Sequence, residues 1–228
     1  MEKKEEEKKI EYKICLLGDC SVGKTAIFKK ISSGEFSDSI STLGIDKKTI
    51  NYKDIEINIK GNIIKKSFDI SLFDTAGQER FRAMTVNYIK GSDGIILIYD
   101  ICNRVSFENI GNWLNSIKGI LSSWKDSNSN YLIMLIGNKS DKVDNSSEAR
   151  EVATEEGKKK SEEYDIYWGG ECSAITFTDI QLKELFGNLI IDLYKKKGNQ
   201  SNDNKKIELF PNEQTQDQKK RKRKKKCC

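Results

Sequence analysis

One short stretch near the N-terminus constrains the fold more than any other part of this 228-residue chain. Residues 18–25 read GDCSVGKT and match the pattern G-x-x-x-x-G-K-[ST]. At average residue usage, a chain of this length matches that pattern by chance roughly 0.01 times. An apolar segment at 12–17 precedes the motif and a helical pattern at 23–33 follows it. This is the strand–loop–helix context that the motif requires.

The motif predicts a loop that binds phosphate groups. Its glycines let backbone N–H groups curl around a β-phosphate, and the positive end of the following helix adds to the attraction. Lys24 can reach the β- and γ-phosphates, and the Thr25 hydroxyl can bind Mg²⁺. The other residues of the predicted cradle are Gly18, Asp19, Cys20, Ser21, Val22 and Gly23.

The rest of the pattern predicts strands that alternate with helices. Continuous apolar runs at 94–99 and 131–136 are typical of strands covered on both faces. Residues 45–60 and 66–73 alternate apolar with polar, as paired strands do, and Gly61–Asn62 is a candidate turn between them. We expect helices at 106–121, 147–164 and 179–197, and a weaker strand at 166–172. Such alternation indicates an α/β fold with a mostly parallel sheet.

Charge is unevenly distributed along the chain. The net charge is +5, but the last ten residues carry eight Lys and Arg and no acidic residue. Without them, 32 basic residues face 35 acidic ones, a net charge of −3. We expect residues 1–9 to be a disordered charged arm and 198–228 to be a flexible tail. A basic tail on a mildly acidic body indicates binding to an anionic membrane surface or to nucleic acid.

Composition excludes several classes of protein. The chain has no histidine, which excludes histidine-based acid–base catalysis and histidine metal sites. Its six cysteines show no CxxC spacing, so a disulfide framework or a zinc site is not expected. No apolar run approaches the ~20 residues of a membrane-spanning helix, and the charged start lacks the apolar stretch of a secretory signal.

A second motif, Asn138-Lys139-Ser140-Asp141, follows the strand predicted at 131–136. At the carboxyl end of a strand, it lies where open α/β sheets bind ligands. The Asp141 carboxylate can accept hydrogen bonds from N1–H and N2–H₂ of guanine, donors that adenine does not offer. The Lys139 stem can lie across the base. Alone the tetrapeptide could be a solvated loop, but its place after the phosphate loop favours a guanine nucleotide.

A third motif, Asp74-Thr75-Ala76-Gly77-Gln78, follows the strand that ends at Phe73. Asp74 can hold Mg²⁺, usually through water, and Gly77 can present its N–H to a γ-phosphate. Gln78 can orient an attacking water molecule. The alternative interpretation is a carboxylate on a surface turn.

Together these motifs resemble the Rab family of small GTPases, over roughly residues 10–197 and again in the tail. The matching segments are GDCSVGKT (18–25), STLGID (41–46), FDTAGQERFR (73–82), YIKG (88–91), YD (99–100), NKSD (138–141) and ECSA (171–174). The resemblance implies a GTPase domain over 10–197 with the α/β G-domain fold. Its sheet would have six strands, mostly parallel with one antiparallel edge strand, and helices on both faces.

The resemblance also implies a switch between GTP and GDP states that regulates vesicle-mediated membrane traffic. Thr42 would bind Mg²⁺ with its hydroxyl and the γ-phosphate with its N–H, while Ser173 and Ala174 would support Asp141 and the guanine oxygen. Thr42 and Gly77 would release their loops on hydrolysis. Catalysis would rest on Gln78, Lys24 and Thr42, and would be slow because no arginine supplied in cis is evident. Implied partners of this monomer are an exchange factor, a GTPase-activating protein, effectors, a prenylation escort and a GDP-dissociation inhibitor.

The tail ends in Cys227 and Cys228, which match the double-prenylation pattern of the Rab family. One lipid chain binds membrane only marginally, whereas two anchor it stably. The preceding basic run adds about 1 kcal/mol per residue near anionic lipid. The resemblance therefore places the chain on the cytoplasmic face of intracellular membranes, with a cytosolic pool. Nucleic acid is the alternative target, but no aromatic residues interleave the basic run.

The chain departs from the family at several positions. Lys47 stands where an aromatic residue is usual, Phe73 where tryptophan is usual, and Ile175 where lysine is usual. The segment around Thr42 is one residue shorter than the family pattern. Two other functions therefore stay open: a prenylated nucleotide-binding scaffold with impaired switching, and a nucleic-acid-associated GTPase that uses its basic tail.

Overall fold

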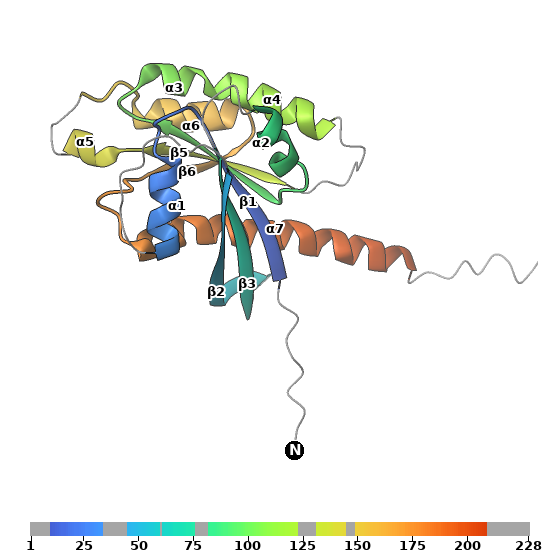
Figure 1. Cartoon of the computed structure of the whole chain (residues 1–228). Coiled ribbons are helices and arrows are strands. Elements are labelled where there is room, and N and C mark those ends of the chain that lie inside the picture. Colours follow the sequence, from blue (N-terminus) through green and yellow to red (C-terminus); the bar gives the residue numbers. More distant parts are fainter. Residues whose placement is uncertain are drawn as a thin grey trace, which may run out of the picture. The chain divides into compact units, whose positions relative to one another are not determined.

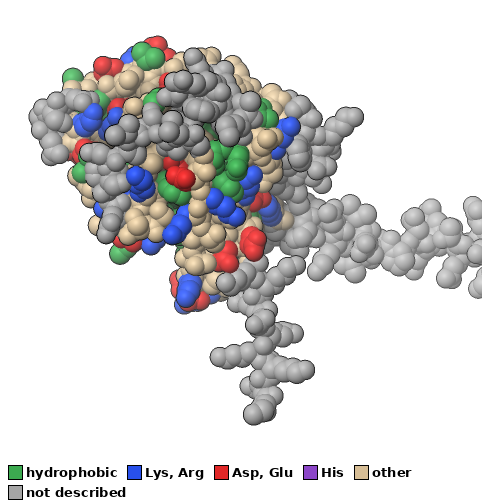
Figure 2. All heavy atoms as spheres, in the orientation of Figure 1, with side chains coloured by type: hydrophobic (Ala, Val, Ile, Leu, Met, Phe, Trp, Pro, Cys, Tyr) green, Lys and Arg blue, Asp and Glu red, His purple; other side chains and the backbone are tan. Residues whose placement is uncertain are grey.

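The computed structural model describes residues 10–33, 45–59, 61–75, 82–122, 131–144 and 149–208, and the side chains of these residues except 82–85, 122 and 198–208. The chain divides into one unit over Met1–Leu193 and another over Tyr194–Cys228. In the described ranges no helix has the length and apolarity needed to cross a membrane. On the face shown in Figure 2, acidic and basic side chains are interspersed and hydrophobic ones form only small groups.

A six-stranded sheet forms the centre of the first unit, in the order β2-β3-β1-β4-β5-β6 (Figure 1). The strands are β1 (Ile10–Leu17), β2 (Ile45–Ile59), β3 (Asn62–Thr75), β4 (Gly94–Asp100), β5 (Leu132–Asn138) and β6 (Tyr167–Glu171). The edge strand β2 is antiparallel to β3, and every other pair of neighbours is parallel. This confirms the predicted fold class.

Helices cover both faces of the sheet (Figure 1). They are α1 (Lys24–Ser33), α2 (Arg82–Ile89), α3 (Arg104–Glu108), α4 (Ile110–Ser122), α5 (Ser140–Asp144), α6 (Thr154–Glu163) and α7 (Asp179–Glu208). The α1 helix and the first part of α7 lie on one face, and α2, α3, α4 and α6 lie on the other.

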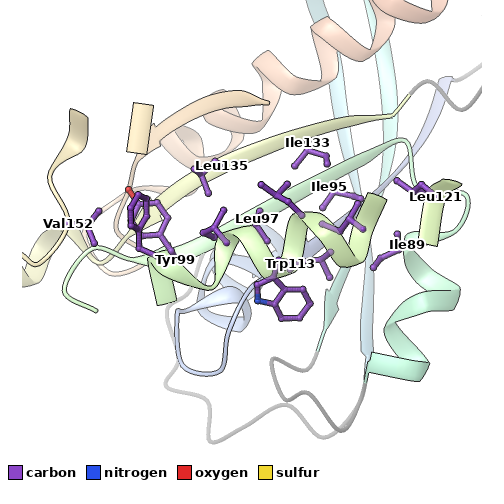
Figure 3. Packing of buried hydrophobic residues seen from close by; sticks show 14 of the residues in the cluster. Ile89, Ile95, Leu97, Tyr99, Trp113, Leu121, Ile133, Leu135 and Val152 are labelled. Carbon is purple, nitrogen blue, oxygen red and sulfur yellow. The ribbon is translucent and has the colours of Figure 1, made fainter. Parts of the chain in front are cut away.

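The core on the α4 face is a continuous apolar cluster, shown in Figure 3. Alternate residues of the central strands, such as Ile95, Leu97 and Tyr99, point into it and meet α4 through Leu114 and Ile117. The intervening residues of β4 face the other helix layer. There a Cβ atom at position 94 would lie 3.3–3.4 Å from side-chain atoms of Ile14, Leu189 and Leu193, so a larger residue would have to displace them by a few tenths of an ångström. Burial on both faces explains the continuous apolar runs of β4 and β5.

The hairpin of β2 and β3 confirms the predicted strand pair. Its turn contains Gly61 at φ +90°, and the Gly61 N–H donates to the Asn58 side chain at 2.9 Å. The register shifts between Tyr52 and Ile55, where Asp54 adopts a φ of +53°. The hairpin is longer than predicted because β3 begins at Asn62 rather than at residue 66.

Several element boundaries differ from the predicted ones. The helix predicted at 147–164 begins only at Thr154, because the N–H groups of Glu151 and Val152 bond to the Ile101 carbonyl instead. The helix predicted at 106–121 is divided into α3 and α4 at Asn109. The last helix continues past Lys197 to Glu208. Its extension contains no proline, and adding a residue to an existing helix is easier than starting one.

Candidate functional site

The predicted site residues meet at one edge of the sheet. Because β1, β3, β4, β5 and β6 are mutually parallel, their carboxyl ends lie along the same edge. The loops that follow β1, β5 and β6 carry the three groups of predicted ligand-binding residues, and Asp74 lies near the end of β3. This is the position at which open α/β sheets bind ligands.

Close packing against two neighbouring chain segments shapes the phosphate loop. Gly18 has a φ of +140°, and a Cβ atom there would lie 2.2 Å from the Ile98 carbonyl oxygen. Gly23 has a φ of +98°, and a Cβ atom there would lie 2.2 Å from the Asn138 Nδ2 atom. Both positions therefore require glycine, for backbone conformation and for space. Ser21, between them, also adopts a positive φ, of 62°.

Lys24 is folded back into the loop that it belongs to. Its Nζ donates to the carbonyl oxygens of Gly18 at 2.9 Å and Asp19 at 2.6 Å, and the residue is 5% exposed. Burial lowers the pKa of Lys24 to about 8, although the nearby Asp74 carboxylate opposes the shift. The ammonium group is therefore held at the centre of a loop whose backbone curls around it.

Thr25 and Asp74 form a polar pair at the start of α1. The Thr25 hydroxyl donates to Asp74 Oδ2 at 2.5 Å, and Asp74 is fully buried. The next residue, Thr75, donates its hydroxyl to the Leu16 carbonyl oxygen at 2.7 Å and so ties β3 to β1. One hydroxyl and one carboxylate beside a phosphate loop suit Mg²⁺, which usually takes one or two protein oxygens together with substrate phosphates and water.

Asn138 joins the base-binding motif to the phosphate loop. Its Nδ2 donates to the Val22 carbonyl oxygen at 2.8 Å, and its Oδ1 accepts from the Ala174 N–H at 3.3 Å. One buried amide thereby connects the loops after β1, β5 and β6. The tetrapeptide is no isolated solvated loop, which was the alternative interpretation from the sequence.

Asp141 and Ser173 form the second link. The Ser173 hydroxyl donates to Asp141 Oδ1 at 2.5 Å, and Ser173 Oγ accepts the N–H groups of Ile175 and Thr176 at 3.1 and 3.0 Å. Ser173 is fully buried and Asp141 is 6% exposed. One Asp141 oxygen is thus held from behind by a neutral hydroxyl group, which orients the carboxylate.

Lys139 has a strained backbone and a specific partner. Its φ is +73°, and its Nζ lies 2.7 Å from Asp100 Oδ2 at the end of β4. Asp100 also accepts the Cys102 N–H at 2.9 Å. In the sequence, Asp100 matches the family only as part of the dipeptide at 99–100, and no role was predicted for it.

Sequence reasoning also missed the residues that hold Asp19. Trp113 Nε1 donates to Asp19 Oδ1 and Asn109 Nδ2 donates to Asp19 Oδ2, both at 2.7 Å. Figure 3 shows Trp113 at the margin of the apolar cluster. The sequence predicted a helix over 106–121 that contains Trp113, but no partner for its side chain. A tryptophan N–H needs a partner when it is buried, and this requirement was the available signal.

A third missed contact supports the loop after β6. Arg150 forms two 2.8 Å hydrogen bonds to Glu171, and Thr154 adds another at 2.8 Å. Burial raises the pKa of Glu171, but the hydrogen bonds from Arg150 and Thr154 outweigh it and lower the pKa below its ordinary value. Glu171 directly precedes Cys172 and Ser173, so this ion pair fixes the strand end from which they extend.

Five predicted site residues lie outside the described ones: Thr42, Gly77, Gln78, Cys227 and Cys228. Of the remaining loop residues, Cys20 is exposed with its Sγ 3.7 Å from the Ser21 hydroxyl, and Val22 is buried. Within the described ranges no group of three or more acidic or cysteine side chains is placed to hold a metal ion. A metal here would therefore depend on the Thr25 hydroxyl, Asp74 and groups of the ligand.

Comparisons with known proteins agree with this site. The sequence profile of the Ras family matches residues 13–195. Similar proteins include Ras-related protein Rab-11C of Dictyostelium discoideum, 35% identical over 191 residues that cover 83% of this chain and 75% of that protein. Human Ras-related protein Rab-8B is 37% identical over 193 residues, 84% of this chain and 83% of its own. Ras-related protein RABA5e of Arabidopsis thaliana is 36% identical over 184 residues, which cover 80% of this chain and 74% of that protein. The chain therefore belongs to the Ras family of small GTPases, proteins that bind GTP and GDP with Mg²⁺ and hydrolyse GTP.

Proposed function

We propose that this GTPase is a Rab-like switch that acts in vesicle-mediated membrane traffic. One observation carries the guanine part of the proposal. Asn138 bonds to Val22 in the phosphate loop, and Ser173 holds Asp141, so a base acceptor and a phosphate cradle are parts of one bonded structure. Asp141 would accept N1–H and N2–H₂ of guanine, with Lys139 across the base and Ala174 N–H beside the guanine oxygen.

The phosphate part of the proposal uses residues 18–25. The backbone of the loop would surround the β-phosphate, and Lys24 would turn from its own carbonyl partners to the β- and γ-phosphates. Thr25 and Asp74 would hold Mg²⁺, together with Thr42, and the ion would neutralise charge on the phosphate oxygens. The Asn109 and Trp113 donors would keep the Asp19 carboxylate away from those phosphates.

The hydrolytic step would depend on a water molecule oriented by Gln78. Attack of this water breaks the bond between the γ-phosphorus and the bridging oxygen, yielding GDP and inorganic phosphate. Thr42 and Gly77 would contact the γ-phosphate and release their loops when it leaves. Without an arginine in cis the step should be slow, and an arginine of an activating protein could accelerate it by roughly 10³–10⁵.

The tail would place this activity on membranes. We propose that residues 10–197 are the GTPase domain and that 198–228 reach the membrane through a basic run and two prenylated cysteines, Cys227 and Cys228. An exchange factor, an activating protein, effectors, a prenylation escort and a GDP-dissociation inhibitor would act on this monomer. The relatives named Rab support the proposal, as does the cysteine pair at the end of the sequence.

Single-turnover hydrolysis tests the switch. Protein loaded with GTP and Mg²⁺ should accumulate bound GDP over hours, and Gln78→Leu should stop this without weakening GTP binding. Chromatography of the bound nucleotide measures both quantities. Turnover that Gln78→Leu does not change would favour the scaffold interpretation, and failure to retain any guanine nucleotide would refute the proposal.

Removal of Cys227 and Cys228 separates the membrane and nucleic-acid interpretations. We expect the truncated protein to lose membrane association in cell fractionation, although its basic run remains. A nucleic-acid-associated GTPase would instead keep a salt-dependent affinity for RNA or DNA after the truncation. That second result would contradict the proposed membrane role.

Nucleotide affinity should fall as the pH rises through about 8. Lys24 has a pKa of about 8 here, below its ordinary value of 10.5, whereas bound phosphates favour the ammonium form. Between the pKa of the nucleotide-free protein and the higher pKa of the bound state, binding takes up a proton, so the affinity for GDP should fall by up to about tenfold per pH unit. Calorimetric titration from about pH 7 to about pH 9, a range in which most of the guanine keeps its N1 proton, measures this. The exposed-lysine control Lys48→Gln should keep the pH dependence, and a flat curve for the wild type would contradict the prediction.

A further inference from the structure

An aromatic ring between two lysines lies on the open face of β1, β2 and β3. The Phe73 ring has Lys13 Nζ 5.0 Å and Lys47 Nζ 5.6 Å from its centroid. The Tyr88 ring of α2 packs against Phe73, 5.3 Å between centroids, and Lys13 Nζ also lies 5.3 Å from Tyr88. We call these four residues the lysine–aromatic surface. Phe73 is 8% exposed, Lys13 and Tyr88 are half-buried, and Lys47 is exposed.

Neither ammonium group has a carboxylate partner among the described residues. Lys13 Nζ donates to the Lys90 carbonyl oxygen at 3.4 Å. The nearby Asp93 carboxylate accepts the backbone N–H of Lys13 at 2.7 Å, not its ammonium group. Farther along the same face, Asp69 accepts from the Asn51 side chain at 2.5 Å. Glu11, two residues before Lys13 on β1, is also exposed on this face and lies beside Asp69, but no ion pair joins it to Lys13 or Lys47. The two ammonium groups are therefore left without an ion-pair partner among the described side chains.

Two cations over one ring repel each other, and a ring face attracts an exposed cation only weakly. A carboxylate placed between them would relieve the repulsion. It would also form charge-assisted hydrogen bonds while its own stem or backbone packs on the aromatic rings. An apolar partner would have to bury Lys47 without a counter-charge, which is costly. The surface is thus complementary to an acidic segment and unfavourable to a purely hydrophobic one.

The surface adjoins the residues that would sense the nucleotide. Phe73 directly precedes Asp74, the partner of Thr25, and leads into residues 76–81 with Gln78. Lys47 lies two residues after the start of β2 and follows the segment that contains Thr42. Occupation of the surface can therefore depend on the nucleotide, and this part of the inference rests on the proposed function.

We propose that the lysine–aromatic surface binds a protein segment that carries Asp or Glu side chains, and binds it best in the GTP state. The Lys13 and Lys47 ammonium groups would pair with its carboxylates, and Phe73 and Tyr88 would form the apolar floor. Acidic side chains thereby become the selection criterion for its effectors.

The test uses full-length protein loaded with a non-hydrolysable GTP analogue and a display library of random peptides. Peptides that bind the double variant Lys13→Gln/Lys47→Gln are removed before selection on the wild type. A matched control is Lys118→Gln/Lys160→Gln, because these lysines also lie over aromatic rings, of Tyr164 and Phe107. The control has the same change in charge and the same basic tail.

We expect the surviving peptides to be enriched in Asp and Glu and to bind the wild type and the control equally. Their affinity for the double variant should be weaker by roughly tenfold, as for two exposed ion pairs. The single variant Lys47→Glu reverses the charge at an exposed position. It should weaken peptide binding further, without any change at Lys13. Affinity should also be higher with the GTP analogue than with GDP.

Three outcomes would overturn the proposal: no peptide survives the subtraction, the survivors lack acidic residues, or vesicles containing phosphatidylserine rather than peptides distinguish the wild type from the double variant. Single-turnover GTP hydrolysis by the double variant is measured in parallel and should equal that of the wild type. If the wild type hydrolyses GTP normally but selects no acidic peptide that discriminates against the double variant, the surface alone is refuted. Absence of hydrolysis in the wild type refutes the proposed function instead.

Discussion

Replacing Asp141 by asparagine should change the preferred base from guanine to xanthine. The aspartate carboxylate presents only acceptors, matching N1–H and N2–H₂ of guanine. An asparagine side chain can present its NH₂ group there, which opposes the N2–H₂ donor but matches the carbonyl oxygen at C2 of xanthine. A site left with mispaired buried polar groups discriminates on the order of 10³-fold or more. We therefore expect at least that loss of GDP affinity.

The geometry around Asp141 makes this substitution tolerable for folding. The Ser173 hydroxyl that donates to Asp141 Oδ1 can donate equally to an asparagine oxygen. Competition of GDP, xanthosine diphosphate and ADP against a labelled nucleotide measures the change. Asp144→Asn is the matched control, because Asp144 is exposed on the same short helix, α5. Unchanged GDP affinity in Asp141→Asn would show that Asp141 does not bind the base.

Gly18→Ala should destabilise the fold by about 3 kcal/mol or more. The new Cβ would lie 2.2 Å from the Ile98 carbonyl oxygen, and the backbone there has a φ of +140°. Ile98 is fully buried in the central strand β4, where it pairs with Ile136 of β5, so its carbonyl group cannot move away without disturbing the sheet. For a domain of this size, the expected fall in thermal midpoint is roughly 6–12 °C.

Gly61→Ala provides the control for backbone strain alone. Gly61 also has a positive φ, +90°, but a Cβ atom there meets nothing within 4 Å. Its substitution should cost only about 1–2 kcal/mol. Thermal unfolding of both variants and the wild type, without added nucleotide, compares them directly. Equal losses in the two variants would mean that the close approach to Ile98 is not the cause.

Some parts of the fold were predictable because local pattern and burial coincide there. The apolar runs of β4 and β5 are continuous since helices cover both faces, and the alternation in β2 and β3 matches a hairpin with one open face. The short helices α2 and α5 were not predicted. Five to eight residues are too few to form a stable helix alone, so their conformation depends on tertiary contacts.

The sequence by itself determined the chemistry that is encoded in short motifs. The loop at 18–25, the Asn138–Asp141 tetrapeptide and Asp74 were all recognisable, because each ligand needs a particular side chain at a particular place along the chain. Their convergence on one sheet edge followed from predicting parallel strands, and the structure confirms that topology.

Only the tertiary structure decided which groups hold these residues in place. Trp113 bonds to Asp19, Asp100 pairs with Lys139, and Arg150 braces Glu171. The two partners of each pair lie 94, 39 and 21 positions apart in the sequence, respectively. No local pattern encodes such a pair, since a hydrogen bond of this kind exists only after the strands and helices have packed and buried both partners.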